Sequence, residues 1–155
     1  SESVSSKRNK SRNARVHKPL TKALLLPMDR ASASEQSLAN HLALVACRSG
    51  HGNGHLVNEL MRAVYLSWFL QRAGYGTCPA EQFKVAEYAV EATLSHAHER
   101  GEWRLPVETI VDFEALLALH DSQLASAPLH EVLAAEQKLR TFLAGTSSSP
   151  IPVNA

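Results

Sequence analysis

The chain has 155 residues, of which 45% are hydrophobic and 20% are charged, a composition that fits one globular domain with its own core. Its two cysteines, Cys47 and Cys78, lack the spacing of a zinc site or of a disulfide scaffold, so a cytoplasmic location in a reducing compartment is expected. No apolar run is long enough to span a membrane, and no metal or other cofactor and no membrane partner is expected.

Charge divides the chain into two parts of opposite sign. Residues 1–22 carry seven Lys and Arg against Glu2 alone, whereas residues 23–155 carry nine basic and fourteen acidic residues. The N-terminal part is also poor in apolar side chains and cannot stabilise a fold by burial. We therefore predict a flexible basic arm over 1–19, a helical domain over 20–145 and a disordered tail over 146–155.

The first predicted elements follow the arm directly. Residues 23–26 are expected to lie on the body as an extended segment or one helical turn. A long helix is then expected from Ser32, which forms a capping box with Glu35, to Gly50. Its buried stripe is predicted to consist of Leu38, Leu42 and Val45, which recur at helical spacing.

The second long helix is predicted from Leu56 to Ala73. It is apolar on most sides, which is typical of a helix surrounded by others, so we expect it at the centre of the core. Because it includes Tyr65, Trp68 and Phe69, its apolar surface could also exceed what the neighbouring helices cover.

Three more helices are expected to begin at Pro79, Pro106 and Pro128, since proline suits the first helical position. Their predicted buried rows are, in order, Phe83, Ala86, Val90, Leu94 and Ala97; Ile110, Phe113, Leu117, His120 and Leu124; and Leu129, Val132, Glu136, Leu139 and Leu143. Short connections and the absence of alternating polarity predict an all-α, single-domain bundle of about five helices.

A glycine-rich loop joins the first two long helices and is one candidate site. The stretch "SGHGNGH" contains Gly50, His51, Gly52, Asn53, Gly54 and His55. Free backbone N–H groups at the start of the next helix could bind an anion there. The alternative is a plain connection, in which Gly50 ends one helix and Asn53 caps the next.

Two polar residues interrupt the apolar rows of the last two helices. His120 and Glu136 are close in an antiparallel hairpin, so they are predicted to form a buried polar pair. Such a pair could act in acid–base chemistry, but fixing the helix register is the simpler role, because a buried charge needs a partner. No catalytic residue is assigned.

The basic arm is the feature that points most directly to a partner. It contains Lys7, Arg8, Lys10, Arg12, Arg15 and Lys18, interleaved with polar residues. Such an arm can neutralise phosphates without reading sequence, and it could instead be a solubilising tail or a tether to an acidic protein. We expect a non-enzymatic accessory or regulatory protein that contacts nucleic acid. The alternatives are a self-associating helical interaction module and a small metal-dependent hydrolase.

Overall fold

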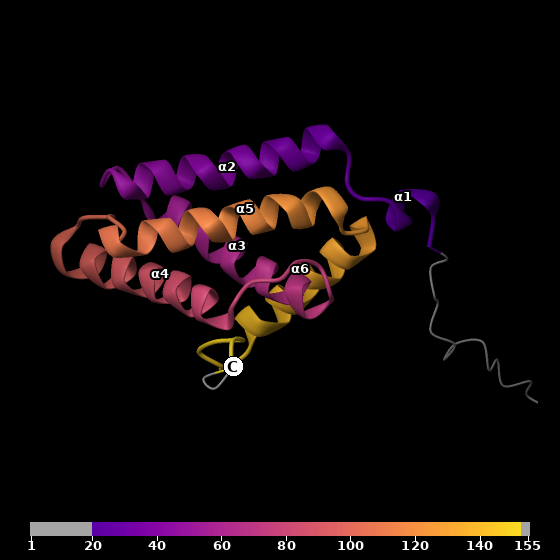
Figure 1. Ribbon diagram of the computed structural model, residues 1–155. Helices are drawn as coiled ribbons and strands as arrows, with labels where there is room; N and C mark the ends of the chain where they lie inside the picture. Colours follow the sequence, from indigo (N-terminus) through magenta and orange to yellow (C-terminus); the bar gives the residue numbers. More distant parts are fainter. Residues whose placement is uncertain (1–19, 153–155) are drawn as a thin grey trace, which may run out of the picture.

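The computed structural model describes residues 20–152, which form a bundle of helices (Figure 1). The elements are α1 (Lys22–Leu25), α2 (Arg30–Arg48), α3 (Gly54–Arg72), α4 (Ala80–Arg100), the 3-10 turn η2 (Val107–Thr109), α5 (Ile110–Ser126) and α6 (Leu129–Ala144). Within this range no strand forms, and one isolated bridge joins His51 to Trp103. The all-α expectation is confirmed, and the five long helices α2–α6 correspond to those predicted.

Helix α3 occupies the centre, as its composition predicts. It packs against α2, α4, α5 and α6, and nine of its residues are buried. Tyr65, Leu66 and Trp68 are all less than 10% exposed. Phe69 is half-buried, so the four surrounding helices leave only part of the predicted apolar row accessible.

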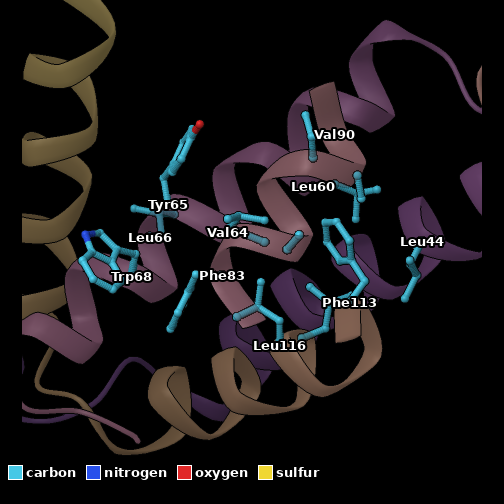
Figure 2. Close-up of a cluster of buried hydrophobic side chains, with 14 of the residues drawn as sticks. Leu44, Leu60, Val64, Tyr65, Leu66, Trp68, Phe83, Val90, Phe113 and Leu116 are labelled. Atoms are coloured by element: carbon cyan, nitrogen blue, oxygen red, sulfur yellow. The ribbon is translucent and has the colours of Figure 1, made fainter. Parts of the chain in front are cut away.

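The core lies where α3 meets α4 and α5 (Figure 2). Phe83 of α4 and Phe113 of α5 are fully buried, and the Trp68 ring meets Phe83 edge-on at 5.3 Å between centroids. Tyr65 lies at the margin of this cluster, where its hydroxyl donates a 2.7 Å hydrogen bond to Glu87. Such edge-on aromatic pairs add to the stabilisation that burial gives.

The first turn of α2 differs from the predicted capping box. The helix starts at Arg30, and its N-cap is Asp29, whose carboxylate accepts hydrogen bonds from the Ser32 backbone N–H (3.1 Å) and hydroxyl (2.6 Å). These bonds lower the pKa of Asp29. Ser32 is thus the donor to a cap, and the predicted Ser32–Glu35 box is wrong.

The buried face of α2 also differs from the prediction. Leu38, Leu42 and Val45 are 59%, 56% and 60% exposed, whereas the helix turns Asn40, Ala43, Leu44 and Cys47 inward. Helix α2 packs against α3 and α5. Similar departures occur at the ends of two other rows, since Leu94 of α4 and Leu143 of α6 are 44% and 51% exposed.

Part of the C-terminal segment packs on the body. Ile151 is 5% exposed and belongs to the core, and the Ser149 hydroxyl donates to Glu87 at 2.5 Å. Ser149 and Ile151 therefore contact the body, whereas residues 146–148 are exposed, and the disordered tail stays a prediction. The predicted arm, residues 1–19, lies outside the described residues.

Candidate functional site

The glycine-rich loop closes one end of the bundle against the segment after α4. Gly50 has φ +80°, which favours glycine, and a Cβ there would lie 2.5 Å from Arg104 Nη2. Gly52 lies against Cys47 and the Trp103 carbonyl. Asn53 caps α3 by accepting a 2.9 Å hydrogen bond from the Leu56 N–H, as expected for a helix connection.

Several backbone N–H groups in and after the loop already donate hydrogen bonds within the protein, so fewer are available to bind an anion. The N–H groups of His51, Leu56 and Val57 donate to Ala46, to the Asn53 side chain and to the Asn53 carbonyl, respectively. Arg104, which covers the loop, already pairs with Glu102 at 2.8 Å. Anion binding by Gly50, His51, Gly52, Asn53, Gly54 and His55 stays a prediction.

His120 of α5 is 1% exposed. Its hydrogen bond with Gln123 determines which nitrogen of the imidazole ring carries a proton. Its Nδ1 lies 3.0 Å from Gln123 Oε1. The Gln123 amide nitrogen donates to the Ser67 and Tyr75 carbonyls at 3.0 and 2.9 Å. Because carbonyls only accept, the amide oxygen must face His120, and Nδ1 must therefore carry a proton.

The other ring nitrogen of His120 is consequently an acceptor. Burial lowers the pKa of His120, which favours the neutral ring with an unprotonated Nε2. Nε2 makes no hydrogen bond with any described residue. Among the described residues, three buried side-chain atoms have no hydrogen-bond partner, and Nε2 of His120 is not one of them. They are Asn40 Nδ2, Gln71 Oε1 and Asp121 Oδ1. Nε2 is therefore open to the space beside it.

That space is a cleft of about 360 Å³ between α2, α3, α5 and α6, here called the His120 cleft. Glu136 of α6 lines the same cleft, so the structure brings the two predicted residues to one site, although no hydrogen bond joins them. Arg140, another potential partner of Glu136, donates instead to Gln137. The remaining lining residues are Met28, Ser32, Glu35, Gln36, Arg62, Leu66, Leu124 and Val132.

Sequence reasoning missed most of this cleft. Arg62 and Glu35 are remote from His120 in the chain, so no spacing relates them. Gln123 could have been found, because a residue three positions after His120 on a helix lies beside it.

A second polar contact that the sequence did not predict joins α2 to α5. His41 Nε2 lies 2.8 Å from Asp121 Oδ2 in a groove of about 630 Å³. Both side chains are about one-third or more exposed. No hydroxyl is bonded to the ring of His41 among the described residues, so the contact lacks the nucleophile of a catalytic triad.

Within residues 20–152 no three His, Cys, Asp or Glu side chains are placed to hold a metal ion together. Burial raises the pKa of the Cys47 and Cys78 thiols, which keeps both in the less reactive protonated form. Nor does any described helix have the length and apolar character needed to cross a membrane. Lys7, Arg8, Lys10, Arg12, Arg15 and Lys18 lie outside the described residues.

Comparison with protein-family models, curated proteins and solved structures found no match.

Proposed function

We propose that this protein is a non-enzymatic accessory protein that binds nucleic acid through the basic residues between positions 7 and 18. The observation that carries the proposal is the segregation of charge along the chain. Residues 1–19 hold six Lys and Arg against one Glu, and residues 20–152 hold ten against fourteen acidic residues. Phosphate attraction is thereby concentrated in one short segment.

Contacts within the helical body support this division. Arg48 and Arg104 already have carboxylate partners, Glu114 at 3.5 Å and Glu102 at 2.8 Å. The chain enters the body at an exposed position, since Leu20 is 53% exposed and α1 lies at the edge of the bundle (Figure 1). The basic segment therefore joins the body at its surface.

The test is binding of labelled duplex DNA and single-stranded RNA, measured by fluorescence anisotropy with three proteins that all contain the complete helical domain. They are the intact chain, a variant with Gln at the six basic positions 7, 8, 10, 12, 15 and 18, and a control lacking residues 1–6. The control keeps every basic residue of the segment. We expect the Gln variant to lose at least about tenfold in affinity and the control to bind like the intact chain. Equal binding by all three would reject the proposal.

A second candidate function is self-association through α2. The row of Leu38, Leu42 and Val45, here called the α2 row, lies on the outermost helix of one side of the bundle (Figure 1). In a two-fold dimer the same row is supplied by both copies, so each covers the other. Three side chains give far less area than the roughly 800 Å² per partner of a stable interface, so the dimer would be weak.

Sedimentation velocity over a range of protein concentrations tests this candidate. Leu42→Lys should abolish any dimer, whereas Leu133→Lys, at a similarly exposed position of α6, should leave it unchanged. A monomer at every concentration would remove self-association from consideration.

A further inference from the structure

The His120 cleft has the features of a small-molecule site. Its inner wall carries the buried apolar residues Leu66, Leu124 and Val132, together with the buried imidazole of His120. A volume of about 360 Å³ lies within the range of small-molecule sites. Apolar walls with a few convergent polar atoms are what such sites share.

The unprotonated Nε2 of His120, which is open to the cleft, indicates which group a ligand would present. An unprotonated imidazole nitrogen has a lone pair and no proton, so it can accept a hydrogen bond but cannot donate one. Gln123 holds the ring through Nδ1, and His120 lines the cleft, which leaves Nε2 as the ring nitrogen available to a ligand. The ligand must therefore donate an N–H or O–H at this point.

Charges at the cleft indicate the sign of the ligand. Glu35 and Glu136 line it, against the single cation Arg62. No ion pair within 4.0 Å joins Arg62 to either carboxylate or to any other described residue. A carboxylate ligand would meet two like charges and an unprotonated imidazole against the one cation Arg62, whereas an ammonium group would meet three acceptors against one like charge.

We propose that the His120 cleft binds a small amphipathic amine, with its ammonium group donating to His120 Nε2 and Glu136 and its aliphatic part on Leu66, Leu124 and Val132. This inference is independent of nucleic-acid binding by the basic segment. It assigns the body a ligand of its own.

The test uses three probes with the same six-carbon tail: hexylamine, hexanol and hexanoate. Binding to the intact protein is followed at pH 7.5 by two-dimensional NMR. We expect saturable binding of hexylamine, at least about tenfold weaker binding of hexanol, and none of hexanoate. Equal affinities for the three, or no saturable binding of hexylamine, would overturn the proposal.

Variants locate the site without disturbing the core. Glu136→Gln removes a half-buried carboxylate of the cleft and should weaken hexylamine binding about tenfold. Glu131→Gln changes the same helix outside the cleft and should have no effect. Circular dichroism establishes that both variants are folded. Equal weakening by both, or by neither, would place the amine elsewhere.

The imidazole of His120 gives a direct readout that needs no substitution. Long-range ¹H–¹⁵N spectra distinguish a protonated from an unprotonated ring nitrogen. We expect a proton on Nδ1 and none on Nε2, and hexylamine should shift the Nε2 resonance most. A proton on Nε2 in the protein without hexylamine would contradict the proposal, because Nε2 could then not accept a hydrogen bond from the amine.

A lysine side chain carries the same ammonium chemistry as a free amine. The variant Lys7→Gln, Lys10→Gln, Lys18→Gln separates the two sources. Tighter hexylamine binding by this variant would assign the cleft to the chain's own lysines, and unchanged binding would assign it to a free amine.

Discussion

At the scale of single residues, the roles of several side chains depend on a neighbour that the sequence does not place beside them. His120 is held as a neutral acceptor because Gln123 bonds two backbone carbonyls, from Ser67 and Tyr75. The surroundings of the glycines in the loop between α2 and α3 also differ from one glycine to the next. Gly52 has no room for a side chain, whereas Gly54 has ordinary space around it.

The different space around Gly52 and Gly54 allows a matched pair of alanine variants to be compared. In Gly52→Ala the new Cβ would lie 2.7 Å from Cys47 Sγ and 2.9 Å from the Trp103 carbonyl, so backbone must shift. We expect a loss of about 1–3 kcal/mol in the free energy of unfolding, measured with urea. Gly54→Ala, whose nearest atom is 3.5 Å away in Trp103, should be neutral or slightly stabilising. Equal losses would contradict the packing of this loop.

Protonation of His120 predicts a pH dependence of stability. The unfolded chain binds the proton near the ordinary histidine pKa of about 6.5, whereas burial lowers the pKa of folded His120. Below about pH 6.5 the unfolded state thus holds more protons, and the free energy of unfolding falls by up to about 1.4 kcal/mol per pH unit from this residue.

Urea unfolding at pH 7.5, 6.5 and 5.5 measures this effect. His120→Gln should flatten the dependence, and His98→Gln, at an exposed position, should not. The account of His120 fails if all three proteins have the same pH dependence.

At the scale of elements, sequence reasoning succeeds where large apolar side chains form the contact. The row from Ile110 to Leu124 on α5 is buried throughout, as predicted. On α2 the predicted row of Leu38, Leu42 and Val45 faces outward, because the buried face consists of Leu44 together with the smaller or polar residues Asn40, Ala43 and Cys47, which an apolar spacing rule passes over. The burial of Ile151 could not be predicted, because a single aliphatic side chain in a segment low in bulky residues makes no pattern.

Substitution of two leucines of α2, one on each face, tests which face of the helix is buried. Leu44→Ala removes a side chain that is 4% exposed and should lower the free energy of unfolding by about 2–5 kcal/mol. Leu42→Ala changes a side chain that is 56% exposed and should cost less than about 1 kcal/mol. Denaturation with urea distinguishes them, and the reverse order would restore the face predicted from sequence.

At the scale of the whole molecule, the sequence predicts the helical class and the segregation of charge, and the structure adds the cleft. His120 and Glu136 are recognisable as odd members of apolar rows. The other cleft residues come from separate helices, such as Arg62 on α3 and Glu35 on α2, and only the folded arrangement brings them together. The body and the basic segment are thus expected to bind different ligands.

The salt dependence of nucleic-acid affinity tests the charge account most directly. If all six basic side chains of residues 7–18 neutralise phosphates of duplex DNA, the plot of log K against log salt concentration should have a slope of about −5, and the six-Gln variant should have a slope near zero. An intact chain that binds with a slope near zero, or a variant that keeps the slope of the intact chain, would contradict the account.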